Sequence, residues 1–209
     1  MEKPISPSSI PPVLTFYRGG LNVGLFQQGP PIYPQGSEVF GNPNFENSAV
    51  GNPYTYRVQS LDPGEKNYGW ILILSGKDSL ITMKRYGENK SSGIFSEYDG
   101  LYNKSILTTR GKATILQYNE SSYKDWYIPS RDELAFISKN LPLTFSLDSR
   151  FNAMSKFYVS STYIKNSVRK QNFLYQQSFM SDTYGVTSLV EDIETVSVRY
   201  VRRVPVKLI

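Results

Sequence analysis

Residues 123–134 (YKDWYIPSRDEL) constrain the fold more than any other stretch, because they fix where a helix begins. Ser130 and Glu133 have the spacing of a capping box, in which each side chain pairs with a backbone N–H group that a helix start leaves unpaired. The spacing predicts a helix that starts at Arg131, immediately after the cap. We therefore interpret Glu133 as a helix-capping residue and not as a catalytic one.

Apolar residues continue this helix at helical spacing and give it one packing face, formed by Leu134, Ile137 and Leu141. Pro142 disfavours helical geometry in the residue before it, so the helix is predicted to end at Leu141. A helix of about two to three turns is not stable alone in water. We therefore expect it to pack on the rest of the domain, with Trp126 as its first contact.

The composition favours a mixed fold over a helical bundle. Aromatic residues make up 14% of the 209 residues, with 16 tyrosines, and glycine and proline are plentiful. This mixture is typical of short strands joined by ordered loops. The length predicts one domain, or one domain with a sizeable appendage.

Two missing residue types limit the chemistry available to the chain. Without cysteine it has no disulfide, no thiol nucleophile and no cysteine-based zinc site, and without histidine it lacks the commonest general base. No phosphate-binding glycine loop or convincing carboxylate pair takes their place. We therefore predict that the protein is not an enzyme and has no catalytic residue, no metal and no cofactor.

Charge and hydropathy limit its partners. The net charge is +5, but the basic residues are scattered except near the C-terminus, which argues against nucleic-acid binding. No stretch approaches the length of about 18 apolar residues typical of a membrane span, so no membrane insertion is expected. The residues after Met1 lack the apolar segment of a secretion signal, which predicts synthesis in the cytoplasm.

The middle of the chain begins with a strand pattern. Residues 69–74 (GWILIL) form a continuous apolar run, as expected of a strand that is covered on both faces. We interpret residues 75–79 as a turn and residues 80–83 as the strand that returns from it.

Further strands are predicted towards the C-terminus. Residues 157–159 and 172–179 have the residue types of strands, the second with alternating side chains. Residues 195–204 (TVSVRYVRRV) form the last strand. The alternation of apolar and polar side chains along this strand is interrupted between Tyr200 and Val201, which predicts a bulge at that point.

The chain divides near residue 60. Residues 1–60 are rich in proline and glycine, and we interpret them as an extended arm that anchors a domain formed by residues 61–209. Within the arm, residues 18–20 (RGG) separate two apolar segments and favour a β-hairpin. The arm carries too many aromatic residues for a free linker, so we expect it to become ordered on another surface, either its own domain or a neighbouring subunit.

Three separated motifs stand in the second part of the chain. In chain order they are Asp125-Trp126 with Pro129-Ser130 and Glu133-Leu134, then Tyr158-Val159-Ser160-Ser161, then Val198-Arg199-Tyr200-Val201-Arg202. A partial glycine, asparagine and hydroxyl signature precedes them at residues 100–105. This pattern resembles the C-type-lectin-like domain found at the C-terminus of a bacterial collagen-like adhesin and in many bacterial and phage proteins. The similarity covers about residues 67–204.

The resemblance implies an α+β, C-type-lectin-like domain with short antiparallel strands and one or two short helices, preceded by the extended N-terminal arm. It implies that the first and last strands pair antiparallel and bring the two ends of the domain together. Loops at residues 160–172 and 179–192 would then form the far surface. We interpret seven motif residues as structural supports: Trp126, Ser130, Glu133, Ser160, Ser161, Arg199 and Arg202.

Some features of the family are missing from this sequence. Tyr200 stands where many relatives carry a cysteine and Val159 where many carry a tryptophan, so neither a disulfide nor the cysteine-based oxidation of formylglycine-generating enzymes is implied. The calcium-binding loop of lectins with this fold is also missing. Four acidic residues could collect a hard cation or form a solvated loop, and we favour the loop: Asp182, Glu191, Asp192 and Glu194.

The candidate ligand-binding residues lie in the predicted far loops and supply aromatic faces and adaptable hydrogen-bonding groups, which suit a sugar ring or a protein epitope. They are Tyr163, Asn166, Arg169, Asn172, Tyr175, Asp182 and Tyr184. Phage tropism-determining proteins of this fold use the same region for variable recognition. The alternative, that these residues only fill ordered loops in a tyrosine-rich protein, stays open.

Two classes of function follow. The first is a non-enzymatic bacteriophage virion component, in capsid decoration or in a tail or fibre, that is made in the host cytoplasm. It would attach to other virion proteins through residues 1–60 and present its domain to a host-surface glycan or protein. The expected lack of a secretion signal favours this class. The alternative is a bacterial surface carbohydrate-binding or adhesin-type protein of the same family, and a homo-oligomer is compatible with both.

Overall fold

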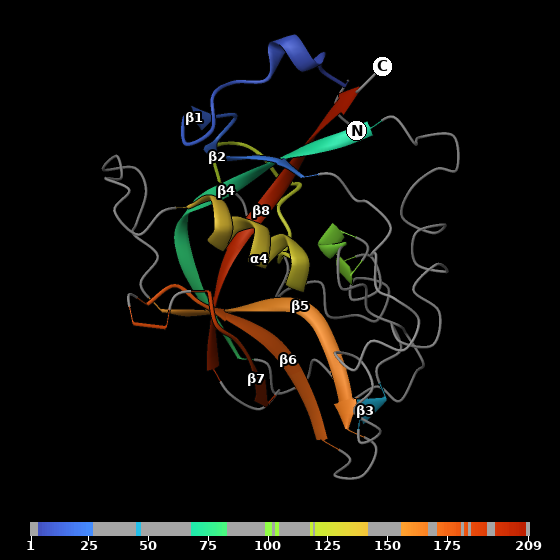
Figure 1. Ribbon diagram of the computed structural model, residues 1–209, viewed down its shortest axis with the longest axis vertical. Coiled ribbons are helices and arrows are strands. Elements are labelled where there is room, and N and C mark those ends of the chain that lie inside the picture. The colour runs from blue at the N-terminus through green and yellow to red at the C-terminus, as the bar shows by residue number, and fades with distance from the viewer. Residues whose placement is uncertain are drawn as a thin grey trace.

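The structure is a computed structural model that describes residues 4–26, 45–46, 68–82, 99–101, 103–104, 118, 120–141, 156–166, 171–180, 182–183, 185–191 and 195–207. Two antiparallel sheets of four strands each and the helix α4 (Arg131–Asn140) make up most of this part of the chain (Figure 1). A short 3-10 helix, η1 (Pro7–Ser9), lies near the N-terminus. Two antiparallel sheets with one helix are consistent with the expected α+β class and equally with a mostly-β domain.

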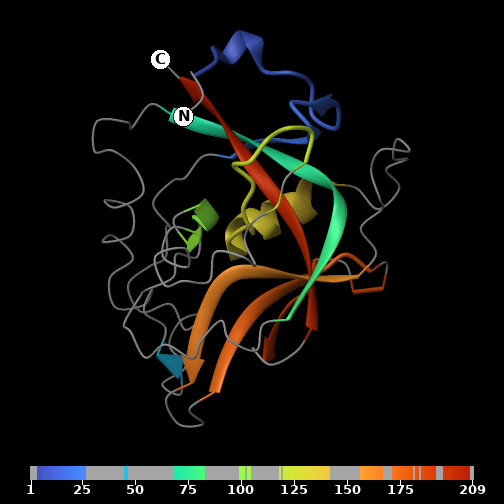
Figure 2. The same cartoon turned by 180° about the vertical axis from the view of Figure 1, so that it is seen from behind.

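The first sheet has the strand order β1-β2-β4-β8. Its members are β1 (Phe16–Tyr17), β2 (Gly20–Phe26), β4 (Tyr68–Thr82) and β8 (Thr195–Lys207). β4 and β8 pair antiparallel from Tyr68 opposite Lys207 to Thr82 opposite Thr195, which confirms the predicted pairing of the first and last strands. Both strands are longer than the short strands that we predicted. Figure 2, the view from behind, shows the two strands side by side.

The predicted turn at residues 75–79 is wrong, because β4 continues through it with a bulge. Leu74 pairs with Val201 and Asp78 with Arg199, so residues 75–77 all lie opposite Tyr200. Polar contacts fill the bulge: Arg199 Nη1 donates to the Ser75 carbonyl at 2.9 Å, and the Tyr200 N–H donates to Ser75 Oγ at 3.1 Å.

The bulge therefore lies in β4 and not in β8, where we predicted it. Even-numbered apolar residues of β8, from Val196 to Val206, all pack in one core cluster, whereas Val201 packs in the other. Alternation is regular along the strand. The apparent interruption arises because β8 is buried on both faces, so apolar residues occur on each.

The N-terminal segment corrects the predicted boundary near residue 60. The predicted β-hairpin is present as β1 and β2, with Arg18 and Gly19 at positive φ between them. β2 then pairs with β4 in the same sheet, from Leu21 opposite Leu74 to Phe26 opposite Trp70. Residues 4–26 are thus part of the domain and not an arm that leaves it. Apart from residues 45–46, the rest of the predicted arm, residues 1–3, 27–44 and 47–60, lies outside the described residues.

Burial explains why this segment joins the domain. Leu21 and Val23 are buried in the core cluster that also contains Leu72 and Leu74. Asn22, fully buried on the other face, donates through Nδ2 to the carbonyls of Pro11 and Pro12 at 2.9 and 3.0 Å. An apolar strand paired with the edge of β4 buries more surface than a free arm would.

The second sheet has the strand order β3-β5-β6-β7. Its members are β3 (Phe45–Glu46), β5 (Phe157–Asn166), β6 (Gln171–Ser178) and β7 (Thr187–Glu191). The strand predicted at residues 172–179 is confirmed as β6. β5 is longer than predicted and includes residues 160–166, which we expected in a loop.

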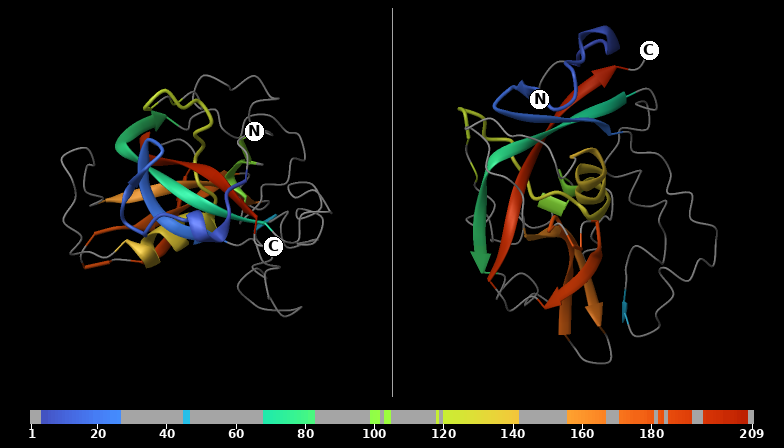
Figure 3. Two further views of the ribbon diagram at one scale, coloured as in Figure 1. Left: turned by 90° about the horizontal axis from the view of Figure 1, so that it is seen from above. Right: turned by 60° about the vertical axis from the view of Figure 1, so that its left-hand side comes forward.

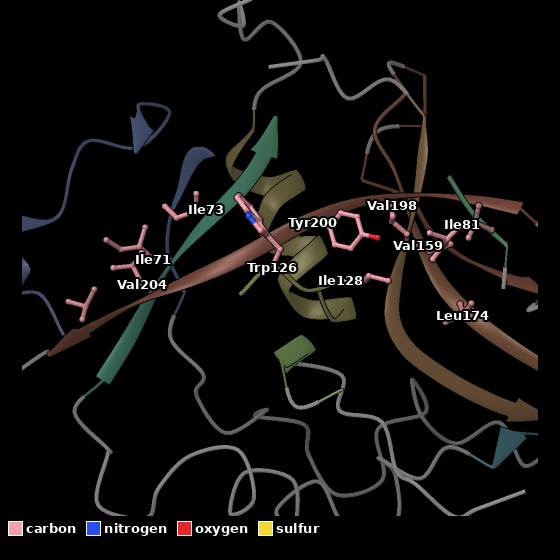
Figure 4. Packing of buried hydrophobic residues seen from close by; sticks show 12 residues of the cluster. Ile71, Ile73, Ile81, Trp126, Ile128, Val159, Leu174, Val198, Tyr200 and Val204 are labelled. Carbon is pink, nitrogen blue, oxygen red and sulfur yellow. The ribbon is translucent and has the colours of Figure 1, made fainter. Parts of the chain in front are cut away.

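Helix α4 forms where the sequence predicts it, with the capping box of Ser130 and Glu133 in place. Its apolar residues Leu134 and Ile137 pack with Tyr127 in one core cluster. Trp126 is buried in the other cluster, with Ile71, Ile73 and Tyr200 (Figure 4). The predicted role of Trp126 as the first contact of the helix is therefore wrong, and Tyr127 has that role.

The two ends of the described chain lie together. Ile5 forms a parallel bridge with Val206, and its N–H donates to the Pro205 carbonyl at 2.9 Å. β3 and the adjoining ends of β5 and β6 lie at the opposite end of the molecule (Figures 1 and 3). No helix in the described ranges is long and apolar enough to cross a lipid bilayer.

Candidate functional site

Glu133 is the centre of a buried polar network that joins its own motif to the upstream glycine signature and to β8. Its Oε2 accepts from the backbone N–H groups of Ser130 at 2.8 Å and Gly100 at 3.0 Å. Its Oε1 accepts from the Tyr127 hydroxyl at 2.8 Å and from Arg203 Nη2 at 2.7 Å. Glu133 is fully buried, so the carboxylate is committed to these internal donors.

Arg203 completes this network and was not among the residues that we selected from the sequence. Its Nη2 also pairs with Asp99 at 2.9 Å, and both side chains are buried. Burial alone would lower the pKa of Arg203, but the charges of Asp99 and Glu133 outweigh it and hold the pKa well above its ordinary value. Burial raises the pKa of the Tyr127 hydroxyl well above its usual range. The odd-numbered spacing from Arg199 was the signal that could have indicated Arg203, since residues 199, 201 and 203 share one face of a strand.

The glycine and asparagine of the upstream signature belong to the same region. A side chain at Gly100 would meet the Ile128 carbonyl at 2.5 Å, so only glycine fits there. Asn103 Nδ2 donates to Ser161 Oγ at 2.9 Å, and the Ser161 N–H donates to the Pro129 carbonyl at 2.7 Å. Ser161 therefore ties β5 to the segment that leads into α4. Ser160 Oγ accepts from the Thr162 N–H at 3.2 Å.

Both motif arginines are buried and pair with carboxylates, although the partner of Arg202, Asp125, is 47% exposed. Arg199 is fully buried and pairs through Nη2 with Asp78 at 2.8 Å, while the Tyr158 hydroxyl donates to the same carboxylate at 3.0 Å. Arg202 donates to Asp125 through Nε and Nη2, each at 2.9 Å, and its guanidinium carbon lies 3.7 Å from the centre of the Tyr123 ring. These contacts connect loops and strands within the domain.

Trp126 is also committed to the interior. It is fully buried, its indole N–H donates to the Glu120 carbonyl at 3.3 Å, and its ring packs edge-on against Tyr118 at 5.8 Å. All seven residues interpreted as supports thus make contacts within the protein.

The candidate ligand-binding residues do not form one cluster. Tyr163 and Asn166 lie on β5, and Asn172 and Tyr175 lie on β6 beside it. Asp182 is exposed in the turn that joins β6 to β7, at the other end of β6. The eight residues of β6 extend about 23 Å at about 3.3 Å per residue, so Asp182 lies far from Asn172. Arg169 and Tyr184 are outside the described residues, as are the side chains of Tyr163, Asn166 and Asn172.

The two predicted far loops consequently belong to different ends of the sheet. Residues 167–170 join β5 to β6 at one end, whereas residues 179–186 join β6 to β7 at the other. The expectation that both loops form one surface is wrong, because residues 160–166 and 171–178 form an antiparallel pair instead.

Tyr175 has neighbours that the sequence did not indicate. The Arg131 guanidinium carbon lies 5.2 Å from the centre of the half-buried Tyr175 ring. The Arg131 side chain is 12% exposed, and its Nε pairs with Asp132 at 2.9 Å. Leu189 of β7, 38% exposed, is directly opposite Tyr175, so the two side chains share one face of the sheet. We call Arg131, Tyr175 and Leu189 the Tyr175 patch. Only the packing of α4 on β6 brings Arg131 here, and no local sequence pattern reports such a contact.

The predicted acidic loop holds no metal cluster within the described residues. Asp182 is exposed, and Asp192 and Glu194 lie outside the described part of the chain. The chain shows no significant match to any protein-family model, curated protein or solved structure.

Proposed function

We propose that this chain is a non-enzymatic binding protein with a C-type-lectin-like organisation, carried on a bacteriophage particle, and that the Tyr175 patch contacts a glycan or protein of the host surface. The observation that carries the proposal is the Arg131 guanidinium over the Tyr175 ring, beside the exposed Leu189. A flat aromatic face with a planar cationic group beside it suits the apolar face and the hydroxyls of a sugar ring.

The hydrogen bonds and ion pairs within the domain support a structural role for the motif residues. Glu133, Arg199, Arg202 and Arg203 are committed to partners inside the domain. These charged groups then stabilise the fold, and recognition belongs to other residues. The spatial convergence of the separated motifs around Glu133 and Ser161 supports the resemblance on which the class rests.

Attachment to other virion proteins is proposed for the end where Ile5 and Val206 meet. This end is opposite β3 and the adjoining strand ends, so attachment there leaves the second sheet facing outward (Figure 1). Val13 and Phe16, 49% and 37% exposed in the N-terminal segment, offer apolar contacts for that purpose.

Two experiments test the proposal. Mass spectrometry of gradient-purified particles should find the protein at a fixed ratio to the major virion proteins, and intact, infectious particles without it would overturn the virion assignment in favour of the bacterial adhesin alternative. On a glycan array, Arg131→Ala should bind several-fold less than the wild type. Lys156→Ala, which alters a half-exposed cation outside the Tyr175 patch, is the matched control and should bind normally.

A further inference from the structure

β7 forms one edge of the second sheet and pairs only with β6 among the described strands. The turn before β7 places it beside β6. The Gly185 N–H donates to the Ser178 carbonyl at 3.0 Å and the Ser178 N–H donates to the Val186 carbonyl at 2.9 Å, with Gly185 at φ +82°. This is the hydrogen-bond pattern of a bulge with glycine in its first position.

The bulge sets which backbone groups of β7 face outward. Because Val186 bonds to β6, antiparallel alternation directs the N–H and C=O groups of Ser188 and Val190 inward as well. Those of Thr187, Leu189 and Glu191 then point away from β6. No backbone hydrogen bond from the described part of the chain reaches them.

The outer edges of β8 and of β4 beyond Leu74 are covered or charged. The outer side of β8 bonds to Ile5 near one end and to Tyr127 in its middle, with the Tyr127 N–H donating to the Val201 carbonyl at 2.8 Å. The outer side of β4 beyond Leu74 carries a bulge and Lys77, devices that discourage strand addition.

Among the described residues, none covers the outer side of β7, whose bulge lies before its first residue and whose one charged residue, Glu191, is its last. Residues 186–191 (VTSLVE) contain neither proline nor lysine, and Val186 and Leu189 are 51% and 38% exposed. An apolar strand with unpaired outward groups is a template for another strand.

We propose that β7 pairs antiparallel with β7 of a second copy of this chain, about a two-fold axis at Leu189. In this register Leu189 pairs with Leu189, and Thr187 pairs with Glu191 of the other copy, so every outward-facing residue meets an outward-facing residue. The acidic positions at 191 lie opposite threonines and not opposite each other, whereas a parallel pair in register would align them.

The pairing joins the two second sheets into one continuous sheet. It covers the exposed Leu189 side chains with each other, and it sets the two Tyr175 side chains on the same face of the joined sheet, on either side of the axis. Two copies of the patch on one rigid sheet would engage a repetitive surface together. The dimer itself does not depend on the proposed ligand.

Analytical ultracentrifugation of the full-length chain tests the pairing. The wild type should sediment as a dimer that dissociates on dilution, and Leu189→Lys, which brings two cations together at the axis, should be monomeric at every concentration. Leu80→Lys changes a 70% exposed leucine on the β4 edge and should remain dimeric. A monomeric wild type, or a dimer lost in Leu80→Lys but kept in Leu189→Lys, overturns the proposal.

Disulfide trapping gives a second readout that does not depend on a destabilising charge. The chain has no cysteine, so Leu189→Cys introduces a single thiol. Paired strands hold opposed Cα atoms about 5.5 Å apart, within the range that a disulfide spans. Mild oxidation should link Leu189→Cys into a covalent dimer and leave Leu80→Cys largely monomeric. Equal linking at both positions, or none at residue 189, contradicts the pairing.

Discussion

The single carboxylate of Glu133 joins four segments of the chain. It completes the cap of α4, binds the N–H of Gly100, accepts the Tyr127 hydroxyl and pairs with Arg203 of β8. A buried charge is stable only where donors surround it, and here each oxygen has at least two. The capping role of Glu133 was predictable from Ser130, three residues earlier. Its contacts with Gly100 and Arg203 join residues that are 33 and 70 positions away, which no local pattern reports.

Replacing Glu133 with glutamine should destabilise the domain strongly. The amide nitrogen would replace an acceptor oxygen where donors already point, and Arg203 would lose one of its two carboxylates. We expect the free energy of unfolding to fall by about 3 kcal/mol or more, measured by urea denaturation. Asp132→Asn, which breaks the partly exposed pair with Arg131, should cost less than about 1 kcal/mol. Equal losses in the two variants would contradict the network.

Buried tyrosines should make the protein sensitive to high pH. Burial raises the pKa of Tyr158 to about 12, above its unfolded value of about 10. The folded state holds this proton more tightly, so the stabilisation is complete below pH of about 10 and is lost as the pH rises to about 12. Urea denaturation at about pH 9 and about pH 11 should show a smaller loss for Tyr158→Phe than for the wild type. Identical losses would mean that Tyr158 ionises equally easily in both states.

At the scale of elements, local signals predicted α4, the β1–β2 hairpin and β6, each of which depends on residues close in sequence. The pairing of β4 with β8 was implied by the family resemblance and not by a local pattern. The continuity of β4 was not predictable, because residues 75–77 look like a turn until Arg199 and Ser75 bond across the bulge. The candidate site was predicted only in part: Tyr175 lies beside Arg131, but Asp182 lies beyond the far end of β6.

The membership of β2 in the core gives a prediction at this scale. Val23 is fully buried between β4 and α4 residues, so Val23→Asp should place an unpaired charge in the core and cost about 3 kcal/mol or more. Val13→Asp, in the same segment at a half-exposed position, should change the melting temperature little. If both variants melt like the wild type, residues 4–26 do not pack on the domain and an extended arm is the better interpretation.

At the scale of the whole molecule, the residues that stabilise the fold differ from those that we propose bind the host surface. The buried contacts of Glu133 connect β8 with α4, and those of Asp78 with Arg199 and Tyr158 connect the two sheets. The two ends of the described chain meet at Ile5 and Val206, and β3 with the adjoining ends of β5 and β6 lies at the other end of the molecule (Figure 3). On this arrangement the proposed virion role depends on the second sheet, where Tyr175 lies.

The most direct test is the binding of the labelled protein to host cells, compared between the wild type and Tyr175→Ala well below the melting temperature of both. We predict that Tyr175→Ala binds at least several-fold more weakly, while Leu80→Ala, an exposed change on β4, binds like the wild type. Wild-type binding by a folded Tyr175→Ala protein would contradict the proposal that this patch recognises the host.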